Sequence, residues 1–392
     1  MRILAVAPQP FFSSRGTPLS VYYRTLLLAE QGAEVDVLTY GAGKDIDVPG
    51  VRVLRIPRLR WFEPIPVGPS WQKALLDVLL AIWTIGALLR NRYQAVDAHE
   101  EAVFWCRFLK PLFRFRLIYD MHSSLPQQLR NFEFTTSRLL IGLFRWLERS
   151  CLRSAEVVIT VCPDLHDYAL RVGVPQQRLL LIENSLFEEV QLRRTDGEDP
   201  DTAVQQLRHF APEHPVVLYA GTLEVYQGVE MLVKAFARVV AARPEVRLLI
   251  VGGNDAQVQK LRALADTLGL GERCVLTGHM RRSQVLLQAA SAAILVSPRI
   301  YGTNTPLKIY EHLASGRPMV ATRILSHTQV LDDSVCRLVE PTPEALADGL
   351  LATLAEPEEA ARRARNAAAL FERQYSRPVY AGKIRQLLER LR

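Results

Sequence analysis

The chain has few of the residues from which disulfide frameworks and zinc sites are built. It contains 5 cysteines and 8 histidines among 392 residues, and no two cysteines have the Cys-x-x-Cys spacing of zinc and redox motifs. An odd, scattered set of cysteines is typical of free thiols in a reducing compartment. We therefore expect a cytoplasmic protein without a structural zinc site.

The chain also lacks an apolar run that clearly indicates a spanning helix or a secretory signal. Residues 74–89 form its most apolar stretch, but they fall short of the about 20 residues that cross a bilayer and include Asp77. The apolar start, residues 3–7, runs into Pro8 and predicts a first strand. We predict a buried amphipathic helix at residues 74–89 and a chain that does not cross a membrane.

Motifs of several enzyme classes are missing. No Gly-x-Gly-x-x-Gly follows the first predicted strand and no P-loop is present, which argues against dinucleotide and ATPase functions. No Ser–His–Asp or Cys–His arrangement has a recognisable local sequence. Asp45 and Asp47 form an Asp-x-Asp pair, but in a polar loop they indicate a solvated turn. We predict neither a metal ion nor another cofactor.

Positive charge is concentrated in one segment of the N-terminal half. Residues 102–155 include nine basic and three acidic residues, whereas the whole chain has a net charge of +7. Aromatic residues interleave with these cations, a pattern that suits anionic lipid headgroups or nucleic acid. The alternative is core aromatics alternating with solvated arginines. We predict a peripheral membrane contact through Arg107–Arg153, on the inner face, and no nucleic-acid partner.

Short apolar segments alternate with helical patterns along most of the chain. Such strands, separated by helices, indicate parallel sheets covered on both faces. The pattern fails at residues 187–214, which are polar and charged. A chain of this length exceeds one core. We predict an α/β fold with an N-terminal Rossmann-like domain (1–186), a linker (187–214), a C-terminal domain (215–375) and a last helix (376–392).

Residues 297–318 contain the most informative set of candidate ligand-binding side chains. They follow a buried strand and open a helix, with Thr305 as the predicted cap and Pro306 in the first turn. The free N–H groups and dipole of such a helix start attract anions. Lys308 would add a positive charge, and Glu311 on the same side could accept ribose hydroxyls. The alternative is an ordinary capped helix with a Lys308–Glu311 surface ion pair.

The run from Gly302 to Pro318 resembles the donor-site motif of the retaining GT-B glycosyltransferases of family four, the glycosyl transferases group 1. The resemblance extends over nearly the whole chain and is more specific in the C-terminal half. Further matching segments are Arg15–Thr17, Asp120–His122, Val158–Cys162, Leu181–Asn184, Leu218–Gly228, Ile250–Gly253 and Leu276–His279. The resemblance implies two Rossmann-like domains facing a cleft, with the last helix returning to the first domain.

The resemblance also implies roles for individual residues. Glu311 would hold the ribose of a nucleotide diphosphate sugar, Thr305–Lys308 would cradle its pyrophosphate, and His122 would approach the transferred sugar. The implied catalytic residues are His122, Lys308 and Glu311. The implied donor-binding residues are Gly16, Gly221, Thr222, Gln227, Gly253, His279, Met280, Arg299, Thr303, Asn304, Thr305, Leu307, Lys308 and Glu311. Taken alone, His122 could equally be a partly buried core residue.

Three positions depart from the family motif. Thr303 stands where the family has a glutamate, and Thr222 and Gln227 stand where it commonly has an arginine and a lysine. Those cations neutralise the diphosphate leaving group, where charge develops in the transition state. Arg299, Lys308 or Arg15 could substitute for them, and we hypothesise that Lys308 and Arg299 do so.

We therefore predict a glycosyltransferase that moves a hexose-type sugar from a nucleotide diphosphate donor to a saccharide or lipid-linked acceptor, with retention of configuration. Polysaccharide or glycoconjugate synthesis is the expected context. One alternative is a nucleotide-sugar epimerase on the same fold. Another is a catalytically silent GT-B binding or scaffold protein, which the departures at Thr303, Thr222 and Gln227 would favour.

Overall fold

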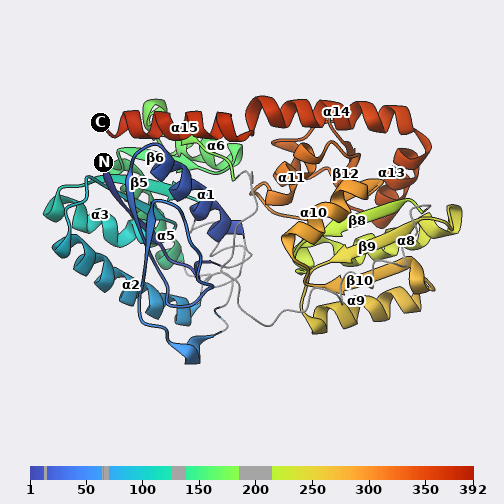
Figure 1. The fold of residues 1–392 in the computed structure, drawn as a ribbon, viewed down its shortest axis with the longest axis horizontal. Coiled ribbons are helices and arrows are strands. Elements are labelled where there is room, and N and C mark those ends of the chain that lie inside the picture. The colour runs from blue at the N-terminus through green and yellow to red at the C-terminus, as the bar shows by residue number, and fades with distance from the viewer. Residues whose placement is uncertain (13–15, 64, 66–69, 125–137, 185–213) are drawn as a thin grey trace. The chain divides into compact units, whose positions relative to one another are not determined.

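The computed structural model describes residues 1–12, 16–63, 65, 70–124, 138–184 and 214–392. These residues form two compact units, which are treated separately below (Figure 1). The first unit holds the described residues up to 184 together with Arg377–Arg392, and the second holds those from 214 to Ser376. The predicted linker, except for its last residue, lies outside the described residues.

The first unit is built on a seven-stranded parallel sheet with the order β3-β2-β1-β4-β5-β6-β7. Except for the edge strand β3, its strands consist mostly of buried residues, which suit a sheet covered on both faces. The strands are β1 (Arg2–Ala7), β2 (Glu34–Thr39), β3 (Val51–Arg55), β4 (Ala95–His99), β5 (Arg116–Met121), β6 (Val157–Thr160) and β7 (Leu179–Leu181).

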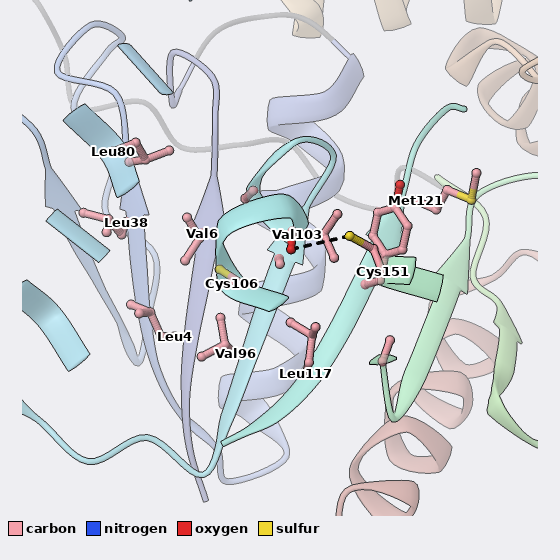
Figure 2. Packing of buried hydrophobic residues seen from close by; sticks show 14 of the residues in the cluster. Leu4, Val6, Leu38, Leu80, Val96, Val103, Cys106, Leu117, Met121 and Cys151 are labelled. Carbon is pink, nitrogen blue, oxygen red and sulfur yellow. Dashed lines mark hydrogen bonds between the residues drawn. The ribbon is translucent and has the colours of Figure 1, made fainter. Parts of the chain in front are cut away.

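Helices cover both faces of this sheet. They are α1 (Gly16–Glu30), α2 (Trp71–Arg90), α3 (Ala102–Phe113), α5 (Arg138–Ser154), α6 (Pro163–Arg171) and α15 (Arg377–Arg390). Figure 2 shows part of the core, in which Leu4 and Val6 of β1 lie near Val96 of β4 and Leu117 of β5. Cys106 and Cys151 belong to this core, and all five cysteines of the chain are buried and unbridged.

Helix α2 corrects the prediction of a buried helix at residues 74–89. It begins at Trp71, and the side chain of Ser70 caps it by accepting a hydrogen bond from the Lys73 amide (3.2 Å). Only 28% of its most apolar 18-residue stretch is buried. By length and composition α2 could cross a membrane. However, Leu76 and Leu80 pack into the core of the first unit, so we interpret α2 as a domain helix with one uncovered apolar face.

The last helix, α15, belongs to the first unit, as the resemblance implies (Figure 1). Gln31, just after α1, donates a hydrogen bond to the Ala381 carbonyl (2.7 Å), and Arg377 pairs with Glu30 (2.7 Å). Tyr380 is buried against Arg24 of α1. The chain end is therefore fixed by side-chain contacts as well as by apolar packing.

The second unit is built on a six-stranded parallel sheet with the order β10-β9-β8-β11-β12-β13. The order reverses between β8 and β11, and ligands of open α/β sheets bind beyond the carboxyl ends of strands at such a point. The strands are β8 (Val216–Ala220), β9 (Arg247–Val251), β10 (Cys274–Gly278), β11 (Ile294–Ser297), β12 (Met319–Thr322) and β13 (Arg337–Val339). The helices include α8 (Val229–Ala242), α9 (Asp255–Thr267), α10 (Arg282–Ser291), α11 (Leu307–Ser315), α13 (Pro343–Ala355) and α14 (Pro357–Gln374).

Candidate functional site

Glycines at the carboxyl ends of β8 and β9 bring backbone and side chains unusually close together. Gly221 follows β8 with φ +154°, and a Cβ there would lie 2.5 Å from the Lys308 Nζ. A Cβ on Gly252, after β9, would lie 1.9 Å from the Gly221 carbonyl oxygen. Real Cβ atoms do not approach so closely, so only glycine fits at either position without displacement. The space that Gly221 leaves is occupied by the Lys308 side chain.

Helix α11 starts beside these glycines. It begins at Leu307, with Pro306 in the cap position and no side-chain cap. The prediction that Thr305 caps this helix is therefore wrong: its hydroxyl is buried and makes no hydrogen bond within the described structure. Pro306 itself has extended backbone angles (φ −64°, ψ 139°), so the helix starts one position further along than predicted.

The Nζ of Lys308 is buried and has no hydrogen-bond partner among the described residues, although the residue as a whole is half-buried. Its Nζ lies 3.9 Å from the ring centroid of Tyr219 on β8. Burial, together with the nearby charge of Arg299 and against the pull of Glu311, lowers the pKa of Lys308 to about 7. The surface ion pair proposed as the alternative is not formed. An ammonium group in this position would gain from an anionic ligand.

Arg299, the second hypothesised phosphate ligand, organises the loop before α11. Its Nε donates to the Tyr301 carbonyl (2.9 Å) and its Nη1 to the Asn304 carbonyl (3.0 Å). A Cβ on Gly302 would lie 2.4 Å from its Nη2, so Gly302 makes this contact possible. In the same loop, the Thr303 carbonyl accepts a hydrogen bond from Gln329 (2.7 Å). Arg299 thus has a structural task here, and its role toward phosphate stays a prediction.

Glu311 pairs with Arg282, a residue that sequence reasoning missed. The Arg282 Nη2 lies 2.9 Å from the Glu311 Oε1. Burial raises the pKa of Glu311, whereas Arg282 and Lys308 pull it down. The only signal in the sequence is the arginine pair Arg281–Arg282 at the start of α10.

The remaining predicted donor residues of the second unit are all uncharged or exposed. Thr222 and Gln227 contact each other through the Gln227 Nε2 and the Thr222 hydroxyl (3.2 Å), so these two positions bring no charge to the site. Gly253 follows β9 with φ +85°. His279 is exposed, whereas Met280 packs into an apolar cluster behind the sheet. Asn304 and Leu307 are half-buried.

His122 and Gly16 belong to the first unit. Gly16 is the first residue of α1, and His122 follows β5 in a buried ionic cluster. The Asp120 Oδ2 lies 3.1 Å from the Arg24 Nη1, 2.9 Å from the His99 Nδ1 and 3.4 Å from the His122 Nε2. Burial opposes ionisation of Asp120, but Arg24 and the two histidines outweigh it and hold the pKa of this carboxyl well below its usual range.

His99, Asp120 and His122 could together offer ligand atoms to a metal ion, because these atoms lie within 4.8 Å of one another. Two observations argue against such a site. The Arg24 guanidinium already contacts the Asp120 oxygen that both histidines share. Burial disfavours a charged His99, but Asp97 and Asp120 outweigh it and raise the pKa of His99 to about 10. A metal ion would have to displace this proton before it could bind the imidazole.

Comparisons with known proteins bear directly on this arrangement. Residues 214–356 match the profile of the family described as glycosyl transferases group 1, and residues 25–185 match a glycosyl transferase 4-like domain. The D-inositol 3-phosphate glycosyltransferase of Xylanimonas cellulosilytica is 30% identical over 368 residues, which cover 88% of this chain and 85% of that protein. The chain belongs to the glycosyl transferases group 1 family and is a glycosyltransferase.

Solved structures show the same fold. Sucrose-phosphate synthase of Thermosynechococcus elongatus superimposes with a TM-score of 0.78 at 22% identity, over 100% of this chain and 98% of that one. HepE of Anabaena, solved with UDP-glucose, gives a TM-score of 0.73 at 17% identity over 99% of both chains. The predicted GT-B class of two Rossmann-like domains is thereby confirmed.

Proposed function

We propose that this glycosyltransferase takes a hexose-type sugar from a nucleotide diphosphate donor. The observation that carries the proposal is the buried, unpaired Lys308 Nζ at the start of α11, in the space left by Gly221. The diphosphate would lie against this ammonium and the first N–H groups of α11. Glu311, one turn further along the helix, would accept the ribose hydroxyls. The binding of UDP-glucose by HepE, which has the same fold, supports a donor of this class.

We propose that transfer retains the anomeric configuration and needs no metal ion. Lys308 would neutralise the diphosphate as it leaves, where charge develops in the transition state. The leaving phosphate would then assist the incoming hydroxyl, so positioning and electrostatics would do the catalytic work. His122, whose ring nitrogen faces Asp120, would approach the transferred sugar from the first unit.

A thermal-shift panel of nucleoside diphosphates and their hexose conjugates tests the donor. One of them should raise the melting temperature, because a ligand that binds only the folded state stabilises it by mass action. The same conjugate should then yield a glycoside of unchanged anomeric configuration in the presence of EDTA, as read by NMR. Epimerised free donor without glycoside would support the epimerase. Binding without turnover would support the silent protein, and no binding would contradict the proposal.

We further propose that the enzyme acts on a saccharide or lipid-linked acceptor at the inner face of a membrane, in polysaccharide or glycoconjugate synthesis. The support is the outer surface formed by α2, α3 and α5, which we call the α2–α3–α5 surface. α3 packs against both α2 and α5. Large apolar side chains are exposed on all three helices: Trp71, Leu75, Val78, Ile82 and Leu89 on α2, Phe108 and Leu112 on α3, and Leu143 and Trp146 on α5.

The charges of the α2–α3–α5 surface complement an anionic bilayer. The exposed cations on or just after the three helices are Arg90, Arg92, Arg114, Arg145, Arg149 and Arg153. The acidic residues within the three helices are Asp77, which is hydrogen-bonded to Tyr40, and Glu148, which is buried. A surface of exposed apolar side chains and arginines without exposed acids suits interfacial binding to anionic lipid.

A further inference from the structure

Arg282 occupies a place that helix stability does not explain. It is the first residue of α10, and Arg281 precedes it in the cap position. The start of a helix carries partial positive charge, so a cation there is unfavourable by electrostatics alone. The sequence nevertheless puts two arginines at this point. A favourable contact outside α10 would offset this cost.

That contact is Glu311 on α11. The Arg282 Nη2 lies 2.9 Å from the Glu311 Oε1, and the two side chains are only 24% and 29% exposed. The Nε and Nη1 of Arg282 are buried and make no hydrogen bond to any part of the chain that the structure describes. The guanidinium of Arg282 thus contacts one oxygen of the Glu311 carboxylate.

The pair affects both the charge and the orientation of Glu311. Burial favours the neutral acid, whereas Arg282 and Lys308 favour the carboxylate. An ionised carboxylate only accepts hydrogen bonds, as two neighbouring ribose hydroxyls require. A charge-assisted contact at Oε1 also restricts rotation of the carboxylate. Without Arg282, the same side chain would be more easily protonated and less well oriented.

We propose that Arg282 is a positioning residue that fixes the Glu311 carboxylate for the donor ribose, and that it thereby sets the preference for ribose over 2′-deoxyribose. The inference rests on the proposed function, because it assigns the nucleoside sugar to Glu311. Arg282 itself need not touch the donor. Arg282 contacts Glu311, the residue that the proposed function assigns to the ribose. Its proposed role therefore differs from that of the diphosphate cations that are missing at Thr222 and Gln227.

The test compares ribonucleotides with their 2′-deoxy forms by titration calorimetry. The nucleoside diphosphate that the wild type binds in the thermal-shift panel, such as UDP or GDP, is compared with its 2′-deoxy form. A ribonucleotide offers one more hydroxyl to Glu311 than its deoxy form. Arg282→Met should therefore weaken the ribonucleotide by about tenfold and the deoxynucleotide distinctly less, so that their affinity ratio moves toward one. Arg282→Lys should restore part of the ratio.

Two further variants separate positioning from charge and folding. Arg281→Met removes the neighbouring arginine and should leave the ratio unchanged. In Glu311→Gln, adding Arg282→Met should have little further effect, because residues that act through one another are not additive. The melting temperature of each unliganded variant is measured alongside, and Arg282→Lys carries the comparison should Arg282→Met fold poorly.

The possible failures are distinct. Equal weakening of both nucleotides by Arg282→Met, with the ratio unchanged, would show that Arg282 acts on the diphosphate or on folding, and would overturn the inference alone. Additive losses in the double variant would do the same. A wild-type protein that binds no nucleoside diphosphate of the thermal-shift panel would instead overturn the proposed function on which the inference rests.

Discussion

At the scale of single residues, we expect the protonation state of Lys308 to depend on a bound ligand. A buried ammonium without an anionic partner is costly, and a lysine in this position loses its proton more easily. Burial accordingly lowers the pKa of Lys308 to about 7. At pH 8 the group is mostly neutral before binding. A bound diphosphate favours the charged form, so the pKa should rise on binding.

This change predicts proton uptake when a nucleoside diphosphate binds at pH 8. Affinity should fall as the pH rises above about 7, because neutral Lys308 must first take up a proton. Calorimetry in buffers of different ionisation enthalpy measures the uptake. Lys308→Met should abolish it and weaken binding about tenfold or more. Lys260→Met, which removes an exposed lysine paired with Glu230, is the matched control. Unchanged uptake in Lys308→Met would assign the proton to another group.

The site was only partly predictable from the sequence, for physical reasons. Lys308 and Glu311 lie in a stretch whose local chemistry indicates phosphate and ribose binding, and Gly221 was predicted from the family resemblance. Arg282 lies 29 positions before Glu311, and their contact depends on how α10 and α11 lie beside each other. No local pattern encodes that arrangement. The predicted cap at Thr305 was wrong because the proline that starts many helices here stands just before one.

At the scale of secondary structure, short apolar runs located the strands well. β8 (Val216–Ala220) is a continuous apolar run of strand length, and β9 is such a run after its first residue, Arg247. The prediction that the helix at residues 74–89 is buried was wrong, because its apolar residues show no clear periodicity. Its apolar residues surround the whole helix, so periodicity could not tell which side would be covered. Exposure was therefore decided by the tertiary structure.

A prediction at this scale concerns Arg24, which joins three elements. From α1 it contacts Asp120 of β5 and lies against Tyr380 of α15, all fully or nearly fully buried. Arg24→Met should leave the buried Asp120 without its strongest neutralising charge and lower the free energy of unfolding of the first unit by about 3 kcal/mol or more. Urea unfolding followed by tryptophan fluorescence measures this selectively, because all five tryptophans lie in the first unit.

Arg377→Met is the matched control for this change. It removes an exposed arginine of α15 whose pair with Glu30 is open to solvent, so its cost should stay below about 1 kcal/mol. If both variants lost the same free energy of unfolding, the buried cluster would contribute no more than a surface ion pair, and α15 would be held by apolar packing alone.

At the scale of the whole molecule, the sequence predicted two parallel sheets but could not predict what covers their outer helices. The alternation of strands and helices determines the fold class. Whether a helix face meets water, lipid or protein depends on surroundings that local sequence does not specify. The α2–α3–α5 surface, with Trp71 68% and Leu89 73% exposed, is the clearest example. Large exposed apolar patches mark interaction sites.

This surface predicts salt-sensitive binding of the intact protein to anionic vesicles. In a flotation assay at low salt, the protein should float with vesicles that contain phosphatidylglycerol. It should float less at 0.5 M salt, because salt screens surface charges. It should not bind vesicles of neutral phosphatidylcholine. Leu75→Glu with Ile82→Glu should reduce binding about tenfold or more, because each places a charge on the apolar face of α2. Leu287→Glu, which changes an exposed leucine of the second unit, should have no effect. The lipid assignment would be contradicted if the α2 variant floated like the wild type. It would also be contradicted if a second copy of the chain covered this apolar face in solution.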